Sequence, residues 1–116
     1  MRDLDSIVSI GRALSDETRV RLLLALSEGE LCLCHLVDLV EMAPSTVSKH
    51  MQLLYQAGLV ERRKDGRWVH FRLAGKDAPP AAASALRWVR RLAESDEALR
   101  RARDSISTQI CDVRLR

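Results

Sequence analysis

Two short helical patterns separated by a four-residue break restrict the fold of this chain more than any other feature. The first pattern covers residues 32–40 and the second covers residues 45–56. The break, EMAP at 41–44, ends in Pro44, which suits the first position of a helix because its missing N–H has no partner there in any case. A short helix, a tight break and a second helix predict a helix-turn-helix.

The second of these helices sorts its residues by face. At about 100° per residue, the apolar side chains of Val47, Met51 and Leu54 fall on one side and small polar or cationic side chains on the other. Such a face suits base edges and phosphates. The residues predicted to contact DNA are Ser45, Thr46, Ser48, Lys49 and, one turn further, Gln52. His50 joins this set, although its position off the exposed face gives a packing role equal weight.

A basic hairpin is predicted directly after the helix-turn-helix. Gly58 ends the second helix, and the strand-like runs 59–63 and 67–73 flank an Asp65-Gly66 turn signal. The hairpin is rich in positive charge, which is the footprint of a nucleic-acid surface, although a solvated charged face is the common alternative. Its predicted contacts with phosphates or the minor groove are Arg62, Arg63, Lys64 and Arg67.

The remaining segments complete a mainly α winged helix-turn-helix fold of five to six helices with a two-stranded antiparallel wing. Residues 4–14 form an amphipathic pattern, and a second helix begins after the capping residues 15–17 and runs to Leu26 before Gly29. After the wing, residues 81–92 are Ala-rich, with helical pattern resuming towards residue 109. We expect a single domain over 1–116, in which the first helix and residues 78–110 form a homodimer interface, unless they only cover the monomer core.

The sequence contains three cysteines. Cys32 and Cys34 stand at the start of the predicted helix-turn-helix, just ahead of its DNA-contacting helix, and Cys111 lies near the C-terminus. The sequence has neither a secretory leader pattern nor an apolar run approaching the roughly 18 residues that span a bilayer, so we expect a cytoplasmic protein away from membranes. An odd number of cysteines in a reducing compartment then predicts free thiols or thiolate ligands.

The spacing of this pair suggests a switch. Residues i and i+2 on a regular helix point about 200° apart, so both sulfurs could hold one ion only if the first turn of the helix from residue 32 were distorted. The hypothesis is that chelation deforms this turn and displaces the helix-turn-helix. The identity of the third ligand is left open: it is Cys111, an external thiol, or absent. His35 is interpreted as a solvent-facing helix residue.

Most of the chain closely resembles the ArsR-family arsenic-responsive repressors. The runs that carry the resemblance are LSDETR at 14–19, GELCLC at 29–34, VSKH at 47–50 and RKDGRWVHFRL at 63–73. The resemblance implies a homodimeric winged-helix repressor that binds double-stranded operator DNA when ligand-free and leaves it when As(III) or Sb(III) is bound. Cys32 and Cys34 match the first two cysteines of the family's metalloid motif, Glu-Leu-Cys-Val-Cys-Asp-Leu-Cys.

The chain departs from that motif at two positions. Val37 stands where the third cysteine would be, and His35 where aspartate is usual. The zinc site that other branches of the family place on their last helix has no ligands here, because residues 81–92 contain no His, Asp, Glu or Cys.

Four alternatives differ from the metalloid repressor. A redox or persulfide sensor would use the same thiols, and a sensor of Cd, Pb or Zn would use them as metal ligands. A DNA-binding architectural protein without ligand response is a third class. An enzyme finds no support, because the sequence has no nucleophile-base arrangement, phosphate loop or spaced carboxylate cluster.

Overall fold

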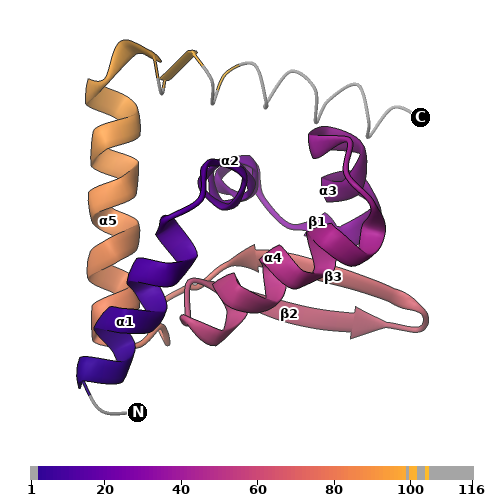
Figure 1. Cartoon of the computed structure of the whole chain (residues 1–116), viewed down its shortest axis with the longest axis horizontal. Coiled ribbons are helices and arrows are strands. Elements are labelled where there is room, and N and C mark those ends of the chain that lie inside the picture. Colours follow the sequence, from indigo (N-terminus) through magenta and orange to yellow (C-terminus); the bar gives the residue numbers. More distant parts are fainter. Residues whose placement is uncertain (1–2, 99, 102–103, 105–116) are drawn as a thin grey trace.

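The computed structural model describes residues 3–98, 100, 101 and 104, and Figure 1 shows its arrangement. Within those residues, five α-helices and a small antiparallel sheet build the mainly α winged helix-turn-helix fold expected from the sequence. The described helices include none with the length and apolar character needed to cross a bilayer.

The first two helices meet at a tight, capped corner. Helix α1 spans Asp3–Leu14, and α2 spans Glu17–Ala25. The predicted cap is confirmed, since the Asp16 carboxylate accepts a hydrogen bond from the backbone N–H of Arg19 at 3.2 Å. A 3₁₀ turn, η1 (Leu26–Glu28), extends α2 to Gly29, whose φ of 133° favours glycine. Helix α2 is central to the core, because Leu22, Leu23, Leu24 and Ala25 are all buried.

The helix-turn-helix is formed by α3 (Leu33–Val40) and α4 (Pro44–Gln56), with Pro44 in the first turn as predicted. Between them, Glu41 adopts a left-handed conformation with φ 54°, and its N–H bonds the carbonyl of Val37 at 2.9 Å, which closes α3. The predicted buried face of α4 is confirmed, because Val47, Met51 and Leu54 are each 0% exposed.

The wing is a hairpin of β2 (Val60–Asp65) and β3 (Trp68–Leu73). Asp65 pairs with Trp68, which leaves residues 66–67 as the turn, and Gly66 has the positive φ of 60° that this turn requires. The sequence did not predict a third strand, β1 (Leu31–Cys32), which pairs with β3 and gives the order β1-β3-β2. Its shortness explains the miss, since two residues carry no alternation pattern.

Helix α5 (Pro80–Ser95) packs beside α1, on the side of the molecule away from the tip of the wing (Figure 1). Both helices also leave large apolar side chains exposed. These are Leu4, Ile7 and Val8 on α1, and Trp88 and Leu92 on α5. The helix-turn-helix and the wing therefore occupy one region of the fold, and an apolar surface occupies another.

Candidate functional site

Cys32 lies at the joint between the sheet and the helix-turn-helix. It is the last residue of β1, opposite His70 of β3, and also the N-cap of α3, with an extended backbone at φ −81° and ψ 160°. The sequence-based boundary, which put Cys32 inside the helix, was wrong by one residue. Because Cys32 is extended and not helical, the angle of about 200° expected between the side chains of Cys32 and Cys34 on a regular helix no longer applies.

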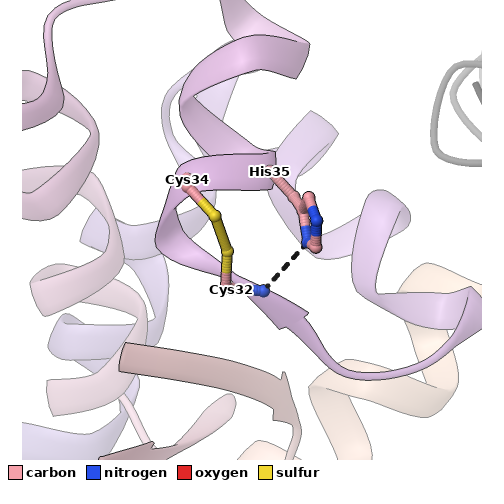
Figure 2. Close-up of side chains that lie close together, drawn as sticks. All are labelled: Cys32, Cys34 and His35. Atoms are coloured by element: carbon pink, nitrogen blue, oxygen red, sulfur yellow. Dashed lines mark hydrogen bonds between the residues drawn. A yellow bond between two sulfur atoms is a disulfide. The ribbon is translucent and has the colours of Figure 1, made fainter. Parts of the chain in front are cut away.

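The two sulfur atoms face each other across this joint (Figure 2). Their residues have Cα atoms 5.3 Å apart, and the structure joins the sulfurs in a disulfide. The expectation of free thiols was therefore wrong for this pair. The hypothesis that both sulfurs meet only after the helix is distorted was also wrong, because the extended backbone at Cys32 already brings them together.

His35 joins the two cysteines, contrary to its sequence-based interpretation as a solvent-facing residue. Its side chain is half-buried, and its Nδ1 accepts a hydrogen bond from the backbone N–H of Cys32 at 3.3 Å (Figure 2). One ligand atom from each of Cys32, Cys34 and His35 lies within 4.8 Å of the others. The missed signal was the capping-box position of His35, three residues after the N-cap.

This cluster can hold a metal ion or metalloid once the disulfide is reduced. Thiolates bind soft ions and imidazole suits zinc and related metals, so the donor set does not favour hard cations such as calcium. Two sulfurs that share one ion with bonds of about 2.3 Å lie no more than about 4.6 Å apart. The Cα atoms of Cys32 and Cys34 lie 5.3 Å apart, so the backbone places both thiols within reach of one ion. Cys111, the other candidate ligand, lies outside the described residues.

The predicted polar face of α4 is exposed. Ser45, Thr46, Ser48, Lys49 and Gln52 are all accessible to solvent. Ser48 and Gln52 line a hollow of about 500 Å³ together with Arg62 and Lys64 of the wing, so helix and wing present one continuous polar and cationic surface. Tyr55 of α4 helps to position Arg62 on this surface, because the Arg62 guanidinium lies 4.6 Å from the centre of the Tyr55 ring in a cation–π contact.

Arg63 differs from its neighbours in the wing. Side chains alternate along β2, and Arg63 bonds Glu30, with Nη2 and Oε1 2.6 Å apart. This hydrogen bond lowers the pKa of Glu30 and raises the pKa of Arg63. His70 lies on the same side, with its Nδ1 3.9 Å from that carboxylate oxygen. Arg67 is exposed at the turn.

His50 is half-buried and contacts α2. Its Nδ1 lies 3.0 Å from Nη1 of Arg19, a residue that is 9% exposed. Because a guanidinium only donates hydrogen bonds, His50 is the acceptor. The structure therefore gives His50 a packing contact behind the exposed face of α4, while the predicted DNA contact of His50 stays a prediction.

Comparison with known proteins agrees with this arrangement. Residues 16–62, which include the cysteine pair and the helix-turn-helix, match the family model described as bacterial regulatory protein, arsR family. The chain belongs to the ArsR family. Family and fold are those of DNA-binding transcriptional regulators, which is also the resemblance seen in the sequence.

Two relatives are similar over somewhat more than half of the chain. The arsenical resistance operon repressor of Escherichia coli is 43% identical over 68 residues, which is 58% of this chain and 58% of the relative. A cadmium resistance regulatory protein, the CadC homolog of Staphylococcus aureus, is 40% identical over 68 residues, or 58% of this chain and 56% of the relative. The matched region thus spans little more than half the length of these relatives.

A solved structure extends the likeness to most of the chain. The homodimeric winged helix-turn-helix DNA-binding domain Mb0332 of Mycobacterium bovis is 28% identical, with a TM-score of 0.66. The alignment covers 84% of this chain and 91% of that domain.

Proposed function

We propose that this protein is a homodimeric transcriptional repressor that binds operator DNA and releases it when Cys32 and Cys34 chelate As(III) or Sb(III). The observation that carries the proposal is the position of the two sulfurs at the joint of β1 and α3. The E. coli relative, named an arsenical resistance operon repressor, supports the choice of inducer. A reducing cytoplasm would keep the two thiols available.

The DNA-binding half of the proposal rests on α4 and the wing. Exposed polar residues of α4 and the cationic side chains of Arg62 and Lys64 border one hollow, as expected where a recognition helix enters the major groove and a wing follows the backbone. Arg67, at the turn, extends the cationic surface of the wing.

The dimer half rests on the exposed apolar side chains of α1 and α5. Leu4 is 66% exposed and Trp88 is 57% exposed, which is unfavourable in water unless a second subunit covers them. The homodimeric Mycobacterium bovis neighbour supports this arrangement. We therefore keep the expected interface between the first helix and residues 78–110.

The inducer acts through the joint. An ion held by Cys32 and Cys34 sets the spacing between β1, which is paired with the wing strand β3, and α3, which packs on α4. A small shift there moves the wing relative to the recognition helix and spoils the surface that both present to DNA. The coupling needed is about 1 to 3 kcal/mol for a 5- to 150-fold change in affinity.

The test is an operator-binding titration with reduced protein, read by fluorescence anisotropy, against arsenite, antimonite, cadmium and zinc. Arsenite should lower the affinity of wild type but not of Cys32→Ser or Cys34→Ser, and Cys111→Ser and His35→Ala then report whether either residue supplies the third donor. An arsenite response that survives in Cys34→Ser contradicts the proposal. X-ray absorption of the bound arsenic counts its sulfur ligands independently.

Two observations favour specific alternatives. The disulfide between Cys32 and Cys34 supports a thiol redox or persulfide sensor, in which oxidation rather than chelation moves the joint. The Cys₂His donor set and the S. aureus relative support a sensor of cadmium, lead or zinc. Release of operator by peroxide or persulfide but not by arsenite identifies the first alternative, and release by the divalent metals alone identifies the second.

A further inference from the structure

An ion pair joins the residue ahead of β1 to the far strand of the wing. Glu30 directly precedes β1, and its carboxylate accepts hydrogen bonds from Nη2 of Arg63 at 2.6 Å and from Nε of Arg63 at 3.4 Å. Arg63 belongs to β2, and the strand order β1-β3-β2 places β3 between the two partners. The ion pair therefore reaches over β3 and links the two outer strands of the sheet.

The ion pair lies on the face of the sheet that carries Cys32. Residues directly opposite each other in an antiparallel sheet place their side chains on the same face. Cys32 is opposite His70 of β3, and His70 is in turn opposite Arg63 of β2. Glu30 lies beside this row, with its Oε1 3.9 Å from Nδ1 of His70. A displacement of β1 at Cys32 therefore reaches Arg63 by two paths, through the backbone pairing with β3 and directly through Glu30.

Arg63 stands between the two wing residues that border the recognition helix. Arg62 and Lys64 line the hollow shared with Ser48 and Gln52 of α4. Because side chains alternate along a strand, they lie on the face opposite to that of Arg63. An arginine that donates to both oxygens of a carboxylate is fixed in orientation as well as in distance. The anchoring of Arg63 on one face therefore helps to set where Arg62 and Lys64 stand on the other.

We propose that Glu30 is a positioning residue whose ion pair with Arg63 transmits inducer binding to the outer strand of the wing. The inference rests on the proposed function and adds the contact through which the thiol pair acts on the DNA-binding surface. When a bound ion shifts β1, Glu30 moves with the strand and draws Arg63 along. Arg62 and Lys64, the neighbours of Arg63 on β2, are then displaced relative to α4.

The experiment measures how far arsenite weakens DNA binding. Reduced protein is titrated onto a labelled duplex, selected by the wild type from a random DNA pool, with and without saturating arsenite. The ratio of the two dissociation constants, read by fluorescence anisotropy, is the arsenite response. Because arsenite is saturating for each variant, a change in its own affinity does not enter this ratio, which reports only the coupling between the two sites.

Glu30→Gln keeps the size of the side chain and removes its charge, so it should lower the arsenite response about three- to fivefold. Arg63→Gln should reproduce this loss, and the double variant should lose no more than either single variant, because the two residues form one link. Glu61→Gln is the matched control. Glu61 pairs with Arg72 at 3.3 Å inside the hairpin of β2 and β3, and its replacement should change the response less than about twofold.

Two outcomes overturn the link and leave the proposed function standing. One is an unchanged response in Glu30→Gln, with or without a lower free energy of unfolding in urea, which gives Glu30 at most a structural role. The other is an equal loss of response in Glu61→Gln, which assigns the effect to general weakening of the wing. If the wild type itself shows no response to arsenite, the proposed function fails and the link fails with it, so the two failures are distinguishable.

Discussion

Arg19 donates a hydrogen bond from Nη1 to Nδ1 of His50, and the two atoms lie 3.0 Å apart. The same guanidinium donates from Nε to the carbonyl of Ala13 at 3.0 Å and from Nη2 to the carbonyl of Arg12 at 2.9 Å. One buried side chain thus ties the C-terminal end of α1, next to the proposed dimer surface, to the recognition helix.

Replacing Arg19 tests this connection. Arg19→Lys keeps the charge but lacks the planar fork that reaches three acceptors, so at least one buried acceptor loses its partner. We expect a loss of about 2 kcal/mol in the free energy of unfolding, measured by urea denaturation. Arg21→Lys is the matched control, because Arg21 is an exposed arginine of the same helix, and it should lose less than about 0.5 kcal/mol. Equal losses in the two variants would show that the hydrogen bonds of Arg19 add nothing to the free energy of unfolding.

His50 and Lys49 should differ in how they affect operator binding. His50→Ala should weaken binding several-fold without changing the slope of log affinity against log salt, since His50 positions α4 from behind. Lys49→Ala should reduce the magnitude of this slope by about 1, because a lysine that contacts a phosphate releases a counterion. A reduced salt slope in His50→Ala would instead indicate direct contact of His50 with the DNA backbone.

Three basic residues of the wing, Arg62, Arg63 and Lys64, should differ in their effect on operator binding. Arg62→Ala and Lys64→Ala should each weaken operator binding and reduce the salt slope by about 1, since both side chains border α4. Arg63→Ala should leave the slope nearly unchanged, because Glu30 already neutralises Arg63. Anisotropy titrations at several salt concentrations measure these slopes, and a full loss in Arg63→Ala would place that residue on the DNA.

Glu30 makes a pH-dependent contribution to stability. The hydrogen bond from Arg63 holds its pKa below the ordinary value of 4.5, so ionised Glu30 stabilises the fold above that pH, and the contribution is lost as pH falls through the lowered pKa. In Arg63→Ala the pKa of Glu30 should return towards its ordinary value. Carboxyl carbon NMR across the acid range measures this shift, and an unchanged Glu30 pKa in the variant would exclude Arg63 as the cause.

Met51 tests the buried face of the recognition helix. It is 0% exposed, so Met51→Ala should cost about 2 to 5 kcal/mol of unfolding free energy in urea titrations. Gln56→Ala, on the exposed face of the same helix, should change it by less than about 0.5 kcal/mol. Similar small losses in both variants would contradict the packing described for α4.

The fold could be predicted from local patterns wherever an element is long enough to show a period. The faces of α4, the cap at Asp16 and the turn that follows Asp65 all follow from side chains a few residues apart. The strand β1 could not be found in this way, because its two residues are extended only through pairing with β3, which is distant in sequence.

The candidate site, like the fold, could be predicted from the sequence only in part. Sequence identified Cys32 and Cys34 but misplaced the helix start by one residue, and this error reversed the argument about their geometry. The role of Arg63 depends on Glu30, which is distant in sequence and which no spacing rule reveals, whereas the role of His35 follows from its position three residues after the N-cap once the start of α3 is known. The set of residues on α4 that is predicted to contact DNA needed only helical periodicity, and its solvent exposure was confirmed.

Cys32 belongs both to β1 and to the cap of α3, and this limits how the proposed ligand response can change during evolution. Serine at this position would suit the cap of α3, because serine is a preferred N-cap residue, but it could not form the bond to Cys34. The affinity for thiophilic ligands would disappear with it. If the proposed function holds, a repressor that no longer responds to its inducer is a single substitution away, and selection for inducibility has to maintain the cysteine.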